Sequence, residues 1–168
     1  MLLATAMQIF LNTYHNLLML TVIQRVTYAK VTVNDCLIGE IGQGIVALVA
    51  IKENDSETEA KQLIDRILSY RIFADKNGKM NLSLKDINGG LLLIPQFTLA
   101  ANTKKGARPS FSCVAAPQLS KPLFEFTTRY AKQQYAAVSC GEFAADMQVT
   151  LCNDGPVTFT LKTRNEDG

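Results

Sequence analysis

Histidine is nearly absent from this sequence, and its absence excludes several kinds of chemistry. The single histidine, His15, lies before the first strand that the residue pattern predicts. Ser-His-Asp and Cys-His mechanisms therefore lack their base. The four cysteines are widely spaced and form no CxxC pair, so the sequence predicts neither a metal site nor a disulfide framework. We expect reduced thiols in a cytoplasmic protein, with Cys36 and Cys152 buried in strands.

Runs of one charge are also absent. The net charge is +2, and lysine and arginine never occur more than two in a row. A protein that binds an extended nucleic-acid backbone usually carries a basic stripe. Any contact with RNA should therefore be small or confined to an end.

The first eighteen residues are apolar but contain no lysine or arginine. A secretory signal needs positive charge at its start, and polar residues interrupt this stretch too often for a membrane span. Met19 stands directly before the first convincing strand, "LTVIQRV". We predict that Met19 is the natural start, that residues 1–18 are an extension outside the fold, and that residues 19–168 form a single domain.

Strand and helix patterns follow in an order typical of an α+β domain. β-branched runs dominate from Leu20 to Ile51, and the last of them, "GIVALVAI", is apolar on both faces and should be a central strand. Ser56 and Glu59 form a capping box before a helix, and a second helix should start near Ser120 after a long polar loop. The first helix should bury one face, formed by Ala60, Leu63, Ile64, Ile67 and Leu68. The pattern predicts an antiparallel or mixed sheet, curled like a β-barrel, with two flanking helices.

Two short polar stretches end apolar strands. The first, "PQFTLA", contains Thr98, which without a base is a weak nucleophile. The second, "NDGPVT", lies between two alternating runs. Asp-Gly favours a tight hairpin turn, whereas Pro156 has no N–H for a sheet ladder. Because only about 5–6% of X-Pro bonds in folded proteins are cis, turn rules alone predict a hairpin with a trans proline.

Taken together, the motifs closely resemble the bacterial D-aminoacyl-tRNA deacylases from Met19 to about Lys162. The matching stretches stand in the family order: "IQRV", "GEIG", "YRIFADKNGKMNLSL", "QFTLAA", "GARPSF", "GEFAADMQV" and "NDGPVTF". The resemblance implies hydrolysis of D-aminoacyl-tRNA to free tRNA and amino acid, without a cofactor or metal. It also implies a homodimer whose active sites lie at the subunit interface.

The resemblance also implies roles for particular residues. Gln96, Phe97 and Thr98 would line the aminoacyl pocket. Gly155-Pro156 would be cis and reach into the pocket of the partner subunit to select chirality, within the segment that carries Asn153 and Thr158. The remaining implied residues are Arg25, which would hold that segment, and Phe143 and Met147, which match the segment near the terminal adenosine.

This resemblance implies a mechanism that needs no histidine. An aminoacyl ester is already activated, so positioned water and backbone N–H groups that stabilise the oxyanion can suffice. We expect the amides around Phe97 and Thr98 to be those donors, helped by the 2′-hydroxyl of the last ribose, while Thr98 positions rather than attacks. Chirality would be selected by excluding an L side chain, so Gly-tRNA should also be a substrate.

One position departs from the family, and two alternatives stay open. Pro95 stands where the family usually has serine, and a related animal deacylase with relaxed chirality also has proline there. "NDGPVT" follows the bacterial pattern, and we therefore keep the expectation of D selectivity. The alternatives are a tRNA 3′-end binding module without activity and a structural dimer without a ligand.

Overall fold

The computed structural model describes residues 17–104, 106–112 and 114–164. The first strand begins at Leu17, two residues before the predicted start of the domain. The rest of the predicted extension, with His15, lies outside the described residues, so its role stays a prediction.

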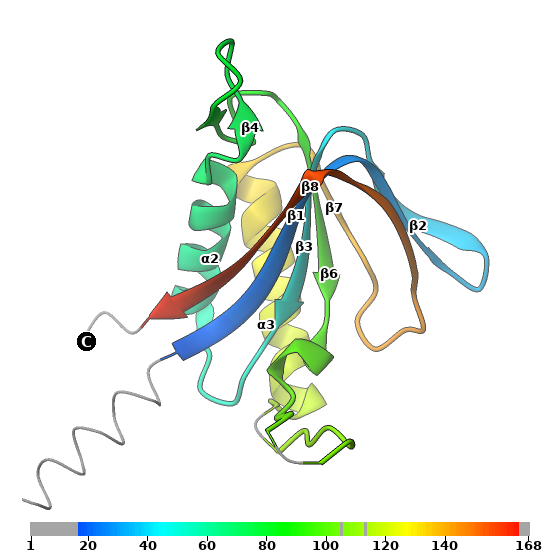
Figure 1. The fold of residues 1–168 in the computed structure, drawn as a ribbon. Coiled ribbons are helices and arrows are strands. Elements are labelled where there is room, and N and C mark those ends of the chain that lie inside the picture. Colours follow the sequence, from blue (N-terminus) through cyan, green and yellow to red (C-terminus); the bar gives the residue numbers. More distant parts are fainter. Residues whose placement is uncertain (1–16, 105, 113, 165–168) are drawn as a thin grey trace, which may run out of the picture.

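Eight strands and two helices make up the described fold (Figure 1). The helices are α2 (Glu57–Ser69) and α3 (Pro117–Gln134), and a short 3-10 turn, η1, spans Phe97–Ala100. The strands are β1 (Leu17–Val33), β2 (Cys36–Ile41), β3 (Gly44–Ala50), β4 (Phe73–Ala74), β5 (Met80–Leu82), β6 (Gly90–Pro95), β7 (Val138–Cys140) and β8 (Gln148–Arg164).

The main sheet is mixed and nearly closes into a barrel. Its order is β2-β1-β3-β6-β7, with β8 paired to β1. β3, β6 and β7 run parallel, whereas β1 pairs antiparallel with β2, β3 and β8. The hydroxyl of Ser139 in β7 donates a hydrogen bond to the carbonyl of Glu40 in β2 (2.9 Å), which brings the two ends of the sheet together. The predicted fold class is confirmed.

The central strands are apolar on both faces because each face has its own core. On β3, the side chains of Ile45, Ala47 and Val49 pack under α2 and α3, whereas Val46 packs on the other side against the curled part of β1. The prediction of a central strand at "GIVALVAI" is therefore confirmed. A strand buried on both faces holds its carboxyl end in a fixed place.

The predicted helices are present. Ser56 and Glu59 form the capping box of α2, and the five residues of its predicted inner face are fully buried. α3 begins at Pro117, three residues before Ser120, and no side chain caps its N-terminus at Ala116. Among the described residues, no helix is long and apolar enough to cross a membrane.

The predicted hairpin at "NDGPVT" is wrong, since the segment lies inside the single long strand β8. β1 is long enough to pair with both halves of β8, and the register shifts between Val26↔Asn153 and Gln24↔Thr158. Residues 154–157 therefore bulge opposite Arg25 alone. The side-chain oxygen of Asn153 accepts the N–H of Val157 (3.0 Å), so a side chain replaces the missing ladder bond.

The prediction that Cys36 and Cys152 are buried is also wrong, because both are exposed. Cys36 opens β2 opposite Val33, at the tip of the β1–β2 hairpin. Cys152 lies opposite Tyr28, whose side chain is also exposed. A strand pattern indicates alternation between two faces, but only the packing of the sheet decides which face is covered.

Candidate functional site

Gln96, Phe97 and Thr98 lie at the carboxyl end of β6. The N–H of Gln96 donates to the carbonyl of Val49 in β3 (2.7 Å), and the chain then turns into η1. This bond fixes the start of the turn to the rigid centre of the sheet. Phe97 is 55% exposed and Thr98 is exposed, so the turn presents both side chains to solvent.

The Thr98 hydroxyl is positioned but not activated. Its oxygen accepts a hydrogen bond from the side-chain amide of Gln96, and an amide N–H cannot act as a base. Within the described part of the chain, no group accepts a hydrogen bond from the backbone N–H of Phe97 or of Thr98. The turn therefore offers two free N–H donors beside a hydroxyl, an arrangement that can stabilise an oxyanion and orient a water molecule.

Phe143 lies beside this turn. It lines a small cavity of about 30 Å³ together with Gln96, Phe97 and Phe124, and its ring centroid is 6.4 Å from that of Phe124. Met147 packs close to Gly141 and against the second core. The enclosed space has room for about one water molecule. An aminoacyl group would therefore have to lie outside it, against the exposed side of the turn.

Arg25 organises a second group of predicted residues at the β8 bulge. Its Nε atom donates to the carbonyl of Asp154 (3.2 Å) and forms an ion pair with the Asp154 carboxylate (3.0 Å). Its Nη1 atom donates to the carbonyl of Ile72, in the segment after α2 (2.7 Å). The Arg25 side chain is 14% exposed, which makes these charge-assisted bonds strong. The bulge is thereby held to β1 and to the segment after α2.

The outer side of the bulge carries the motif itself. Asn153 Nδ2 donates to the hydroxyl of Thr158 (2.9 Å), and that hydroxyl also accepts from Gln24 Nε2 (3.4 Å). Gly155 and Pro156 are exposed, and the peptide bond between them is cis. Gly155 has φ +125°, a conformation that L side chains rarely adopt. The bulge thus presents a Gly-Pro backbone outward from a fixed base.

The two groups lie far apart within one chain. Arg25 pairs with Ile45, which pairs with Leu91, five residues before Gln96. Strand rise and strand spacing place the bulge and the η1 turn about 20 Å apart. In Figure 1 the bend of β8 lies in the upper half of the molecule, and the turn that follows β6 lies in the lower half. One chain therefore does not bring Gly155-Pro156 to Gln96, Phe97 and Thr98.

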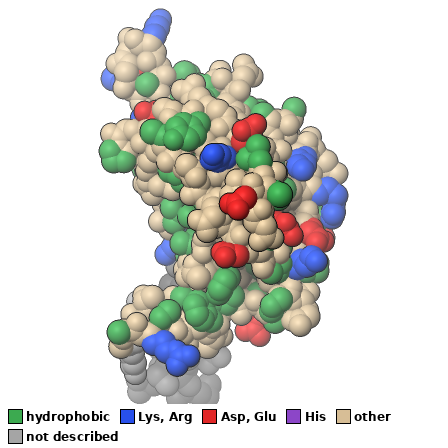
Figure 2. All heavy atoms as spheres, turned by 90° about the vertical axis from the view of Figure 1, so that its right-hand side faces the viewer, with side chains coloured by type: hydrophobic (Ala, Val, Ile, Leu, Met, Phe, Trp, Pro, Cys, Tyr) green, Lys and Arg blue, Asp and Glu red, His purple; other side chains and the backbone are tan. Residues whose placement is uncertain are grey.

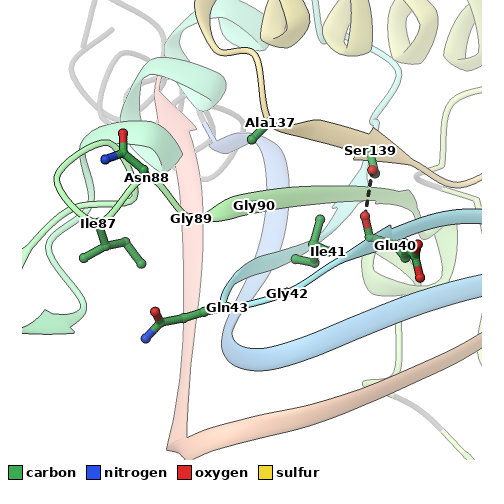
Figure 3. Close-up of a pocket in the computed structure, with 10 residues that line it drawn as sticks. All are labelled: Glu40, Ile41, Gly42, Gln43, Ile87, Asn88, Gly89, Gly90, Ala137 and Ser139. Atoms are coloured by element: carbon green, nitrogen blue, oxygen red, sulfur yellow. Dashed lines mark hydrogen bonds between the residues drawn. The ribbon is translucent and has the colours of Figure 1, made fainter.

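A separate cavity of about 400 Å³ lies at the opposite end of β3 and β6 from η1 (Figure 3). It is lined largely by the turns around Gly42 and Gly90, and the bond between Ser139 and Glu40 lies at its side. None of the predicted site residues lines it. Among the described residues, no group of three His, Cys, Asp or Glu side chains could hold a metal ion.

Two residues that contribute to these groups were not singled out from the sequence. Phe111, from the 101–116 loop, places its ring centroid 5.3 Å from that of Phe97 and is 43% exposed. Asp154 pairs with Arg25. Phe111 lies in "GARPSF" and Asp154 in "NDGPVT", so the motifs contained both. Nothing in the motifs showed which residues they contact, and Arg25 lies more than a hundred residues before Asp154.

Comparison with known proteins now decides the family. A family model described as D-Tyr-tRNA(Tyr) deacylase matches residues 22–162. The D-aminoacyl-tRNA deacylase of Pseudoalteromonas translucida (strain TAC 125) is 58% identical over 139 residues, 83% of this chain and 96% of that protein. The chain belongs to the D-Tyr-tRNA(Tyr) deacylase family. The family resemblance predicted from the motifs is confirmed.

Other members and structures support the same family and fold. The D-aminoacyl-tRNA deacylase of Nitrosococcus oceani is 53% identical over 144 residues, 86% of this chain and 93% of that protein. A solved structure described as c-Myc DNA Unwinding Element Binding Protein has a TM-score of 0.81 at 34% identity and covers 86% of this chain and 98% of that chain. A probable eukaryotic D-amino acid tRNA deacylase has a TM-score of 0.76 at 15% identity, which supports the fold alone.

Proposed function

We propose that this deacylase-family member hydrolyses the ester bond of D-aminoacyl-tRNA, and of Gly-tRNA, to free tRNA and amino acid. The observation that carries the proposal is 58% identity over 96% of a D-aminoacyl-tRNA deacylase. The η1 turn supports the same chemistry, because it combines free N–H donors with a positioned hydroxyl and no base. Such proofreading serves translation, so we propose that the protein acts in the cytoplasm.

In the proposed mechanism, the N–H groups of Phe97 and Thr98 stabilise the oxyanion that forms when water attacks the ester carbonyl. The Thr98 hydroxyl orients the aminoacyl end. The 2′-hydroxyl of the last ribose passes a proton from the attacking water to the ester oxygen of the ribose, the acyl C–O bond breaks, and the amino acid and the tRNA with a free 3′-hydroxyl are released. No covalent intermediate forms on the protein. Phe143 and Met147 lie toward the terminal adenosine.

We further propose a homodimer in which Gly155-Pro156 of each subunit completes the pocket of the other. The distance between the bulge and η1 within one chain supports this arrangement. Large apolar side chains of the curled strands are exposed, as an interface would require: Tyr28, Leu37, Ile38 and Val149. Figure 2, which looks onto the side from which β2 projects, shows exposed hydrophobic side chains at several places. The inserted backbone would occupy the space that an L side chain needs.

The experiment that tests the function compares hydrolysis of D-Tyr-tRNA, L-Tyr-tRNA and Gly-tRNA. We expect the D substrate and Gly-tRNA to be hydrolysed and the L substrate to resist. Equal rates for the D and L isomers would contradict D selectivity. Binding of charged and uncharged tRNA without hydrolysis would favour the non-catalytic 3′-end module instead.

Thr98→Ala tests the role of the hydroxyl. We expect a rate loss of about ten- to a hundredfold, as a misplaced substrate causes, with the fold intact by circular dichroism. A loss of about four or more orders of magnitude would instead assign Thr98 as a covalent nucleophile, since removing a nucleophile leaves only the residual catalysis of the pocket.

A further inference from the structure

A groove of about 620 Å³ runs along α3 and is not part of the site described above. One wall is α3 from Lys121 to Gln133, and the other is formed by the end of β7 and the residues that follow it, 140–143. Its volume is in the range of small-molecule and nucleotide sites. The segment at its edge leads directly into Phe143.

The groove is continuous with the proposed aminoacyl site. Phe124 and Phe143 line both the groove and the small cavity that contains Gln96 and Phe97. A chain bound with its end at η1 can therefore leave along α3. Phe124 is buried and supports the half-buried ring of Phe143 from behind, and Phe143 offers a face on which a base can stack.

The charges of the groove favour an anion. Lys121, Arg129 and Lys132 line it, with the carboxylates of Glu125 and Glu142. Glu125 is already paired with Lys121 (4.0 Å), whereas Arg129 and Lys132 form no ion pair within the described part of the chain. Both cations are exposed. The guanidinium of Arg129 lies over the Phe126 ring, 5.5 Å from its centroid, and this contact leaves its charge unneutralised. The groove thus holds two positive charges without a carboxylate partner against one unpaired carboxylate.

The spacing of the cations suits a single strand of nucleic acid. Lys121, Arg129 and Lys132 lie on one side of α3, and helix rise places the first and last about 16 Å apart. Two or three phosphates of a single strand can be reached over about that length. The sequence showed no basic stripe, and this short row agrees with contact at one end of an RNA.

We infer that this groove binds the backbone phosphates of the nucleotides that precede the terminal adenosine of the tRNA. The inference rests on the proposed function, because that function supplies the RNA end at η1. Arg129 and Lys132 contact phosphate oxygens, and Phe143, which is half-buried, stacks against a base. The groove would account for binding of the polynucleotide, and the η1 turn for chemistry on the ester.

The test uses the full chain with Arg129→Gln and Lys132→Gln combined. Gln favours helices, so α3 should be retained. Binding is measured by fluorescence anisotropy with an RNA hairpin that has a short unpaired 3′ tail, at several salt concentrations. We expect about tenfold weaker binding and a salt slope reduced by about 1.4, which corresponds to two phosphate contacts on a single strand.

Two variants serve as controls. Arg129→Lys with Lys132→Arg keeps both charges and should bind as the unchanged protein does. Lys76→Gln with Lys79→Gln removes the same charge from the exposed turn between β4 and β5 and should leave binding unchanged. RNA binding by the Gln variant equal to that of the unchanged protein would overturn the inference.

Hydrolysis separates the inference from the proposed function. With D-Tyr-tRNA, the Gln variant should raise KM about tenfold and leave kcat unchanged. With D-tyrosyl adenosine, which carries no phosphate, kcat/KM should not change, and an equal loss on this substrate would overturn the inference. If the unchanged protein hydrolyses neither substrate, the proposed function fails. The anisotropy experiment still tests, independently, whether the groove binds RNA.

Discussion

At the scale of single residues, Arg25 explains how an interrupted strand can be rigid. Its guanidinium bonds to the carbonyls of Asp154 and Ile72 and pairs with a carboxylate. Hydrogen bonds to a charged group contribute about 1.5–3 kcal/mol each. Gly155, at the centre of the bulge, can therefore keep a backbone conformation that other residues avoid.

Gly155→Ala should destabilise the protein by about 1–3 kcal/mol, because φ +125° is unfavourable for L-alanine. The new Cβ would also stand 2.7 Å from Val157 Cγ2 and 3.0 Å from Arg25 Nη2. Urea denaturation measures the change. Gly42→Ala is the matched control, since no atom lies within 4 Å of its Cβ, and its effect should stay within about 0.5 kcal/mol. Equal effects of the two substitutions would contradict this account of the bulge.

Asp55 should make stability fall as pH rises. Burial raises the pKa of this carboxyl above 3.8, although the N–H groups of Lys52 and Met19 oppose the shift. The folded state therefore holds the proton to higher pH than the unfolded chain, and stability is lost as pH rises through the folded-state pKa. The free energy of unfolding, relative to that of Asp55→Asn, should decline over this window.

Asp86 should show the opposite dependence of stability on pH. Hydrogen bonds from the side chain and backbone of Ser83 lower its pKa below 3.8, so its contribution is lost as pH falls. The free energy of unfolding that Asp86→Asn loses relative to the unchanged protein should therefore be constant at higher pH and should shrink as pH falls through this window. The Asp55 prediction has its own contradicting outcome. If the difference in free energy of unfolding between the unchanged protein and Asp55→Asn stayed constant from acid to neutral pH, burial would not be raising the pKa of Asp55.

At the scale of elements, the two helices differ at their N-termini. α2 has a complete capping box, in which Glu59 also accepts from the Ser56 hydroxyl (2.6 Å), whereas no side chain caps α3. Ala116 is exposed and has an extended backbone, which a capping residue can adopt. α3 carries the groove and Phe124, so its N-terminus matters for the site.

Ala116→Asp should stabilise the protein by about 0.5–1 kcal/mol, because its carboxylate can accept a free N–H of the first turn. Ser56→Ala should destabilise it by about 1–2 kcal/mol through the loss of the α2 cap. Thermal unfolding should show shifts of opposite sign, a few degrees each. Ala136→Ser, beyond the end of α3, is the control and should have no effect; an equal gain there would contradict capping.

At the scale of the whole molecule, the proposed dimer predicts that subunits complement one another. Phe97→Pro removes one proposed oxyanion donor, and Pro156→Ala alters the inserted motif, so each variant alone should hydrolyse D-Tyr-tRNA poorly. After the two are mixed and allowed to exchange subunits, activity should rise toward about a quarter of the unchanged rate. About half of the dimers then contain one subunit of each variant. In each such mixed dimer, one of the two pockets combines an unchanged η1 turn with an unchanged Gly-Pro motif.

Phe97→Ala, which keeps the N–H, controls for loss of the phenyl ring and should be much more active than Phe97→Pro. If mixing restores no activity although sedimentation shows exchange, the Gly-Pro motif acts within its own chain. That result would contradict the cross-subunit pocket but not the deacylase activity itself.

The sequence by itself determined what depends on neighbours along the chain. The capping box of α2 and the apolar run of β3 are local patterns, and the structure has both. The motifs also determined the family, because their residues and their order along the chain can be compared without a structure. Residues of the η1 turn are consecutive, so "QFT" located that part of the candidate site.

Only the tertiary structure decided what depends on distant partners. "NDGPVT" is a bulged strand rather than a hairpin because β1, more than a hundred residues earlier, pairs on both sides of it. The exposure of Cys36 and Cys152 follows from which faces of the curled sheet are covered. Local propensity cannot encode such pairings, since their free energy comes from contacts between segments that the fold alone brings together.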